Sequence, residues 1–201
     1  MNSDNIELIG KINYMVLLIS GTSYTGKTLM AQTLLEKYKM PYLSIDHLKM
    51  GLYRSGYDCG FTPETNYEII TKKIWPIIKG IIMTNIENNQ NIIIEGCYFP
   101  ESIDDLEKEY TSKILFIYII FSEKYIRNNL LEKIIENRSI IENRGYEFEC
   151  SEEMIEEYIL ENKINKEKCI KNNIKYIEVI DNYAEEMKLL YNWIDKEIKN
   201  I

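Results

Sequence analysis

The chain has 201 residues, 45% of them hydrophobic, and its 32 acidic and 24 basic side chains give a formal net charge of −8. This length and apolar content suffice for a large core, so we expect one folded domain over residues 1–201 rather than a disordered chain. The acidic balance argues against a broad surface for nucleic acid or an anionic membrane, and no apolar run approaches the roughly 20 residues that cross a bilayer.

The first predicted strand, at 15–20, leads into a glycine-containing loop and then into residues with helical spacing up to about 39. The loop at 21–28 reads G-T-S-Y-T-G-K-T, a complete G-x-x-x-x-G-K-[ST] phosphate-binding pattern. Its two glycines let the backbone turn and approach phosphate oxygens without a Cβ in the way. Lys27 is expected to reach the β- and γ-phosphates, and the Thr28 hydroxyl to bind Mg²⁺. The residues expected to bind the nucleotide are Gly21, Thr22, Ser23, Tyr24, Thr25, Gly26, Lys27 and Thr28.

The rest of the chain continues to alternate short apolar runs with amphipathic stretches. The expected elements are a strand at 42–45, one helical turn at 47–52, a polar loop at 51–66, a helix at 67–87, a strand at 92–94, a short helix capped by Ser102, a strand at 114–121, a helix from Ser122 to about 137, a polar segment at 138–151, a helix at 152–172, a strand at 174–180 and a helix at 183–198. This alternation predicts a doubly wound α/β domain with a five-stranded parallel sheet.

Polar side chains stand at the carboxyl ends of three predicted strands, where ligands bind in such a sheet. Besides the phosphate loop after the first strand, Asp46 follows the second strand and Glu95 follows the third. Asp46 has three interpretations: it accepts a proton from an acceptor hydroxyl, it holds a Mg²⁺-bound water, or it caps the helical turn at 47–52. Glu95 is a candidate Mg²⁺ ligand or acceptor contact, and the alternative is an ordinary turn residue.

Several basic side chains are candidates for binding the acceptor or the transferred phosphoryl group. Lys49 and Arg54 would bind an acceptor phosphate or carboxylate, or else belong to an ordinary solvated face. Arg138 and Arg144 are the candidate catalytic cations, because an arginine neutralises charge that spreads over the transferred phosphoryl oxygens. Their alternative role is ion pairing with nearby glutamates. Arg127 is a weaker candidate for the same catalytic role.

Cysteine and histidine usage indicates a reducing compartment and no zinc site. The four cysteines, Cys59, Cys97, Cys150 and Cys169, lie far apart and form no C-x-x-C pair, so we expect reduced thiols. His47 is the single histidine, and one ligand does not make a metal site. The acidic start of the sequence lacks the basic region and cleavage site of a signal peptide. We therefore expect a cytoplasmic protein.

These motifs resemble those of the adenylate-kinase-like P-loop small-molecule kinases, over nearly the whole chain by element order. The family includes nucleoside monophosphate, shikimate, gluconate and 2-phosphoglycerate kinases and chloramphenicol phosphotransferase. The residues that carry the resemblance are the phosphate loop, L-S-I-D-H-L-K at 43–49, I-I-I-E-G at 92–96 and the arginines Arg127, Arg138 and Arg144. The resemblance implies ATP and Mg²⁺ as cofactors, a small helical lid at 138–150 and an acceptor loop at 51–66. Adenylate kinases usually carry arginine where Lys49 stands, and another arginine near Cys97.

The function expected from these features is that of an ATP-dependent kinase, which moves the γ-phosphate of ATP to a small-molecule acceptor. A nucleoside monophosphate or a phosphorylated hydroxy acid would suit. Positioning and charge neutralisation would do most of the catalysis, while the segment at 138–150 closes to exclude water. Two alternatives stay open: a nucleotide-binding regulatory module without an acceptor, and a kinase of a larger acceptor such as a nucleic-acid end or a sugar nucleotide.

Overall fold

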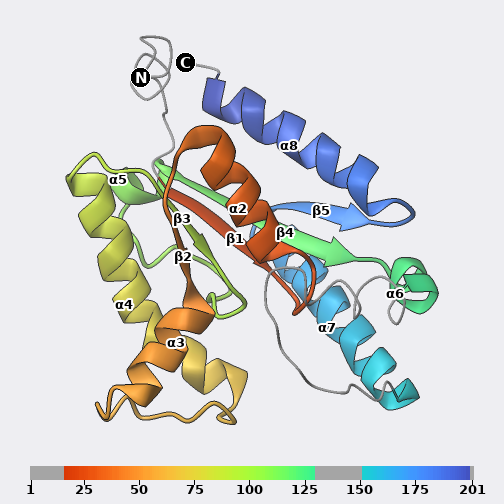
Figure 1. The fold of residues 1–201 in the computed structure, drawn as a ribbon, viewed down its shortest axis with the longest axis horizontal. Helices are drawn as coiled ribbons and strands as arrows, with labels where there is room; N and C mark the ends of the chain where they lie inside the picture. The colour runs from red at the N-terminus through yellow and green to blue at the C-terminus, as the bar shows by residue number, and fades with distance from the viewer. Residues whose placement is uncertain (1–15, 130–150, 200–201) are drawn as a thin grey trace.

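A computed structural model describes residues 16–129 and 151–199, and a parallel sheet lies at its centre (Figure 1). In these ranges the sheet has five strands in the order β2-β3-β1-β4-β5. The strands are β1 (Val16–Gly21), β2 (Tyr42–Ser44), β3 (Ile92–Glu95), β4 (Ile114–Phe121) and β5 (Lys175–Val179). The helices are α2 (Lys27–Tyr38), α3 (Ile45–Arg54), α4 (Tyr67–Glu87), α5 (Lys108–Thr111), α6 (Glu123–Asn129), α7 (Glu152–Lys171) and α8 (Tyr183–Lys199). The expected doubly wound α/β fold is confirmed.

Both faces of the sheet are buried, which explains why its central strands are continuous apolar runs. Successive side chains of a strand point to opposite faces. In β4, Leu115 and Ile117 belong to a core shared with α2 and α8, whereas Ile114 and Phe116 belong to a second core shared with α4. A parallel sheet with helices on both sides needs apolar residues at every position of its inner strands.

Helix α3 is longer than the sequence predicted. It begins at Ile45 and ends at Arg54, so it replaces the single turn expected at 47–52 and includes the start of the loop expected at 51–66. Gly51 lies inside this helix, and the space around it is open. A glycine at such a position costs a helix only about 1 kcal/mol, which the packing of the apolar face of α3 can offset.

The two serines expected to cap helices differ in outcome. The prediction for Ser102 was wrong, because its hydroxyl accepts a hydrogen bond from the Asp104 amide at 3.0 Å and α5 begins only at Lys108. Such a local side-chain turn competes with helix formation. The prediction for Ser122 is confirmed, since its hydroxyl accepts a hydrogen bond from the Tyr125 amide at 3.1 Å. The helix expected to reach about residue 137 is described only as far as the end of α6.

The strand register brings the predicted site segments to one edge of the sheet. Ile19 of β1 lies opposite Glu95 of β3, and Ser44 of β2 lies opposite the same residue. Because the three strands are parallel, the phosphate loop, the start of α3 and the segment after Glu95 all leave the sheet at its carboxyl edge.

Candidate active site

The phosphate loop connects β1 to α2 and depends on two glycines. Gly21 (φ +146°) and Gly26 (φ +89°) both have positive φ values, a conformation that residues with a Cβ rarely adopt. A Cβ on Gly21 would overlap the backbone carbonyl of Ile119 in β4, and one on Gly26 would overlap the Tyr183 hydroxyl. The packing around the loop therefore requires glycine at both positions.

Lys27 begins α2, and its side chain lies back along the loop. Its ammonium group donates a hydrogen bond to the Thr22 carbonyl at 2.7 Å, and the Thr25 hydroxyl donates to the same carbonyl at 2.9 Å. Lys27 is only 7% exposed, so its charge is held within the loop rather than in solvent. The first turn of α2 carries no acidic side chain, which leaves the positive end of the helix open to an anion.

The residues present fit a magnesium ion that binds together with a nucleotide. Within the described ranges, no group of three or more His, Cys, Asp or Glu side chains could hold a metal ion. Thr28 lies in the first turn of α2, and Glu95, 2% exposed, ends the strand next to β1. Mg²⁺ typically takes one or two protein oxygens and completes its sphere with phosphate oxygens and water. Thr28 and Glu95 are thus suitable candidates for the protein ligands.

Asp46 lies in the first turn of α3 and not at its N-cap. Ser44 occupies the N-cap position, so the interpretation of Asp46 as the cap is wrong. Its carboxylate lies 3.5 Å from the Lys49 ammonium group, and its side chain is 31% exposed. Asp46 follows β2, and β2 is separated from β1 only by β3. The carboxylate therefore lies at the same edge of the sheet as the phosphate loop, and it is partly open to solvent.

Lys49 is held by neighbouring side chains and does not belong to a solvated face. It is 9% exposed, donates a hydrogen bond to the Tyr98 hydroxyl at 2.8 Å and lies 4.8 Å from the centre of the same ring. Burial works against its charged form, but Tyr98 and Asp46 outweigh this effect and raise the pKa of Lys49. Arg54, by contrast, is exposed at the far end of α3, as its solvated-face alternative expects.

Beside Asp46 and Lys49 lie three further residues that the sequence did not point to: Tyr67, Cys97 and Tyr98. The rings of Tyr67 and Tyr98 stack with their centroids 5.2 Å apart, and the Tyr67 hydroxyl donates to the Cys97 carbonyl. Burial raises the pKa of the Cys97 thiol, while the charge of Lys27 lowers it in part. The place of Cys97 and Tyr98 directly after Glu95-Gly96 was a usable signal, but nothing in the sequence marked Tyr67.

Helix α7 contributes polar side chains to the phosphate loop, which sequence reasoning also missed. The Tyr158 hydroxyl donates to the Ser23 carbonyl at 2.6 Å, and the Asn165 amide donates to the Thr22 hydroxyl at 3.1 Å. Asn162, 1% exposed, accepts a hydrogen bond from the last residue of β4 at 2.8 Å. The available signal was the spacing of these polar residues, which places them on one helical face.

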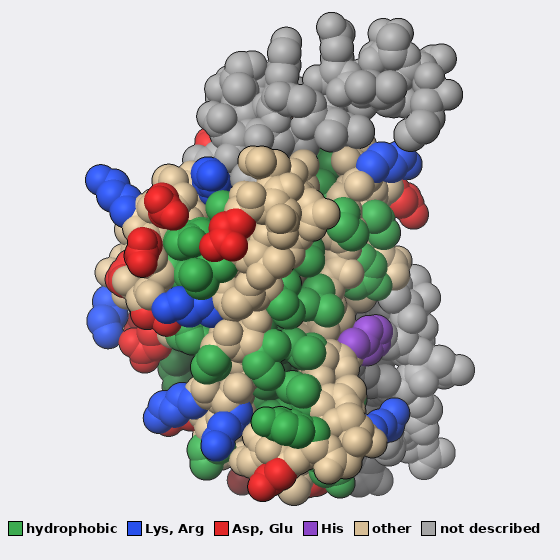
Figure 2. All heavy atoms as spheres, turned by 90° about the vertical axis from the view of Figure 1, so that its left-hand side faces the viewer, with side chains coloured by type: hydrophobic (Ala, Val, Ile, Leu, Met, Phe, Trp, Pro, Cys, Tyr) green, Lys and Arg blue, Asp and Glu red, His purple; other side chains and the backbone are tan. Residues whose placement is uncertain are grey.

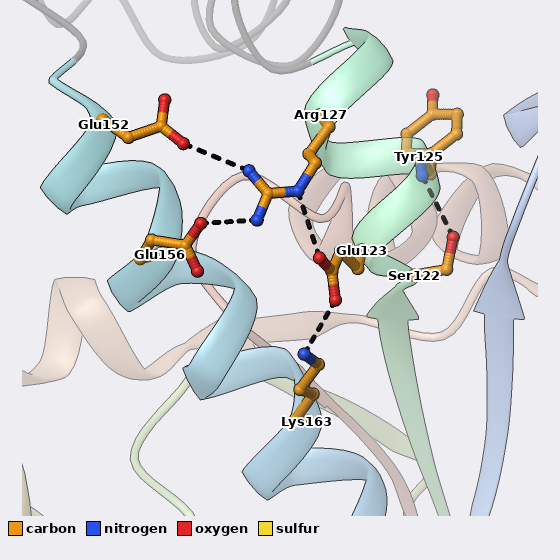
Figure 3. A network of polar contacts seen from close by, with 7 residues as sticks. All are labelled: Ser122, Glu123, Tyr125, Arg127, Glu152, Glu156 and Lys163. Carbon is orange, nitrogen blue, oxygen red and sulfur yellow. Dashed lines mark hydrogen bonds and ion pairs between the residues drawn. The ribbon is translucent and has the colours of Figure 1, made fainter.

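Arg127 is part of a charged network that joins α6 to α7 (Figure 3). Its guanidinium group lies 3.1 Å from Glu123, 3.2 Å from Glu152 and 2.5 Å from Glu156, and Glu123 also binds Lys163 at 2.8 Å. Hydrogen bonds with Lys163 and Arg127 lower the pKa of Glu123. The network is exposed to solvent, so it positions the two helices more than it stabilises the fold.

The other two arginines of the predicted site, Arg138 and Arg144, lie outside the described residues, as does the lid expected at 138–150. The arrangement that the structure does describe consists of a phosphate loop with a buried ammonium group and a carboxylate–lysine–tyrosine group beside it. Such an arrangement can bind a phosphorylated ligand and present a second molecule to it.

The sequence matches no protein-family model and no curated protein. The structure is similar to a candidate kinase from Chloroflexus aurantiacus, at 16% identity over 92% of this chain and 98% of the other, with a TM-score of 0.52. It is also similar to the shikimate kinase from Bacteroides thetaiotaomicron, at 12% identity over 90% and 98% of the two chains, with a TM-score of 0.52. The shikimate kinase from Aquifex aeolicus matches at 13% identity over 90% and 96%, with a TM-score of 0.50. The chain therefore has the doubly wound α/β fold of P-loop kinases.

Proposed function

We propose that the protein is an ATP- and Mg²⁺-dependent kinase that transfers the γ-phosphate of ATP to a small-molecule acceptor. The observation that carries this proposal is the buried ammonium group of Lys27, which hydrogen-bonds the Thr22 carbonyl inside a complete phosphate loop. A phosphate oxygen is a stronger acceptor for an ammonium group than a carbonyl, because the hydrogen bond is then assisted by charge on both sides.

On the donor side, the loop and the start of α2 would bind the triphosphate. The backbone amides of the loop donate hydrogen bonds, and Lys27 neutralises charge on the β- and γ-phosphates. Thr28 and Glu95 would hold the metal ion. When bound, Mg²⁺ neutralises the phosphate charge that develops during transfer. The adenylate-kinase-like pattern of these residues supports the assignment.

On the acceptor side, Asp46 would accept the proton of an acceptor hydroxyl or order a water on the metal ion. Lys49, oriented by Tyr98, would bind an anionic group of the acceptor, and Arg54 could assist from the end of α3. The Asp46 carboxylate lies 3.5 Å from the Lys49 ammonium group and offsets part of its positive charge. The charge that remains suits a single carboxylate or phosphate group, as in a nucleoside monophosphate or a phosphorylated hydroxy acid.

Arg138 and Arg144 are proposed as the catalytic cations, in a lid at 138–150 that excludes water during transfer. Replacing either arginine with lysine keeps the positive charge but removes the planar fork that binds two phosphoryl oxygens. The turnover number should then fall. Normal turnover in both Arg138→Lys and Arg144→Lys proteins would mean that another residue neutralises the phosphoryl group.

The alternatives of another class receive less support. A regulatory module that only senses nucleotide does not need the group formed by Asp46, Lys49 and Tyr98 beside the loop. A kinase of nucleic-acid ends needs a basic groove. On the face that carries α4, basic and acidic side chains are interspersed around an apolar centre (Figure 2). This mixture gives no support to a nucleic-acid surface there.

The cellular setting is proposed from the cysteines. Cys59, Cys97 and Cys169 are free thiols, which agrees with a reducing compartment such as the cytoplasm. In the described ranges, every helix is too short or too polar to cross a membrane.

A screen of acceptors by ADP release tests the proposal. The panel contains nucleoside monophosphates, 2-phosphoglycerate, shikimate and uncharged hydroxyl compounds, and a reaction without acceptor measures ATP hydrolysis. We expect one class to raise ADP release well above that background and Lys27→Ala to abolish the increase. A folded protein that binds MgATP but responds to no acceptor would favour the regulatory module instead.

A further inference from the structure

Helix α7 touches the phosphate loop at two points, and a carboxylate lies between them in the sequence. The Tyr158 hydroxyl bonds the Ser23 carbonyl at 2.6 Å, and the Asn165 amide bonds the Thr22 hydroxyl at 3.1 Å. Glu161 follows Tyr158 by three residues and precedes Asn165 by four. Residues with this spacing project from the same face of a helix. The face of α7 that meets the loop therefore carries a negative charge between its two contacts.

Lys27 contacts the same residue of the loop that this face of α7 contacts. Its ammonium group bonds the carbonyl of Thr22, the residue whose hydroxyl Asn165 contacts. The Glu161 side chain is accessible to solvent, yet the surrounding protein is dense enough that desolvation raises its pKa, while Lys27 lowers it in part.

This arrangement is unfavourable for a triphosphate without a metal ion. Glu161 adds a negative charge on the α7 side of the loop, where it interacts electrostatically with Lys27. Metal-free ATP carries more negative charge than MgATP, so a carboxylate beside Lys27 repels the metal-free form more strongly. A bound cation reverses the sign of the interaction with that carboxylate.

We propose that Glu161 makes the phosphate loop select metal-bound ATP over metal-free ATP. The inference rests on the proposed function only in requiring that the loop binds ATP. Without nucleotide, the carboxylate attracts the Lys27 ammonium group. With nucleotide, it repels phosphate charge that no cation compensates, and it favours the complex in which a cation is present. Glu161 is thus a specificity-determining residue, which neither the phosphate-loop motif nor the expected site included.

Calorimetric titration of the full chain with ATP, once with Mg²⁺ and once with EDTA, tests this role. The ratio of the two dissociation constants measures the preference for the metal-bound form. In Glu161→Gln, we expect metal-free ATP to bind about three- to tenfold more tightly, so the ratio falls by at least that factor. Glu161→Asp keeps the charge and should keep most of the preference. Glu167→Gln, which removes an exposed carboxylate from the opposite face of α7, is the matched control and should leave the ratio unchanged.

The proposal is overturned if Glu161→Gln leaves the ratio at the wild-type value, or if Glu167→Gln shifts it as much. Circular dichroism verifies the fold of each variant, and Glu161→Ser removes the same charge should the Gln variant not fold. If the wild-type protein binds ATP neither with Mg²⁺ nor without it, the proposed function fails together with this inference. If Lys27→Ala abolishes ATP binding while Glu161→Gln changes nothing, only the role of Glu161 fails.

Discussion

The donor and acceptor sides of the candidate site are built in different ways. The donor side consists of consecutive residues, and its chemistry comes from backbone amides, a helix end and Lys27. The acceptor side is assembled from side chains of α3, α4 and the segment after β3, with Lys49 and Tyr98 at its centre. The difference teaches that, under the proposed function, donor binding would depend on backbone geometry, whereas acceptor choice would depend on side-chain contacts that single substitutions can change. Substitutions on the two sides should therefore have separable effects.

The largest effect should come from Lys27→Ala. This change removes the ammonium group that donates a hydrogen bond to the Thr22 carbonyl. Because that group is the one proposed to neutralise phosphate charge, we expect ADP production to fall to the background level. The side chain belongs to neither apolar core, so the melting temperature should stay within a few degrees of the wild type. Measuring ADP production and thermal unfolding on the same preparation checks both statements. Normal turnover in a folded variant would contradict the assignment of the donor side.

The next largest effect is expected for Asp46→Asn, on the acceptor side. If this carboxylate accepts a proton or orders a metal-bound water, the turnover number should fall by about 10²–10⁴, while the KM for ATP changes little. Steady-state kinetics with the acceptor found in the screen measures both constants. His47→Gln, at the adjacent exposed position, is the control. An unchanged turnover number would reduce Asp46 to the ion-pair partner of Lys49.

Gly26→Ala tests the claim that the donor side depends on backbone geometry. Gly26 has a positive φ, and a new Cβ would overlap the Tyr183 hydroxyl, so we expect a loss of about 1–3 kcal/mol in the free energy of unfolding. In a Tyr183→Phe background the loss should be smaller, because the hydroxyl is gone. Gly80→Ala, inside α4 and facing open space, should instead stabilise the protein slightly. Urea denaturation measures the wild type, the two single variants at Gly26 and Tyr183, their double variant and Gly80→Ala, and equal losses in both backgrounds would attribute the strain to the backbone alone.

The smallest effect is expected for Tyr98→Phe, which removes the hydrogen bond to Lys49 and keeps the ring that stacks on Tyr67. Loss of one such hydrogen bond should raise the KM for the acceptor about three- to tenfold, with the KM for ATP unchanged. Tyr57→Phe, at a tyrosine that is 71% exposed, should alter neither constant. Equal changes in both KM values for Tyr98→Phe would mean that the two sides are not separable.

The sequence by itself determined the sheet, the order of its elements and the place of the phosphate loop between β1 and α2. Apolar runs such as 92–94 and 114–121 predict strands buried on both faces, and this pattern is a local property of the chain. The phosphate loop is equally local, because consecutive residues between one strand and one helix make the anion site. Local signals failed where a competing local interaction exists, as at Ser102, whose hydroxyl bonds Asp104 and does not start a helix.

Only the tertiary structure decided which side chains surround the loop. The sequence left two interpretations of Lys49 open, an acceptor-binding residue and part of a solvated face, but the side chain is buried against Tyr98, on another element. Tyr158 and Asn165 contact the loop because α7, which is far from the loop in sequence, packs beside β4. Contacts of this kind depend on how separate elements pack in space. The periodicity of a helix or strand shows which of its faces is polar. It does not show which other element that face will contact in the folded protein.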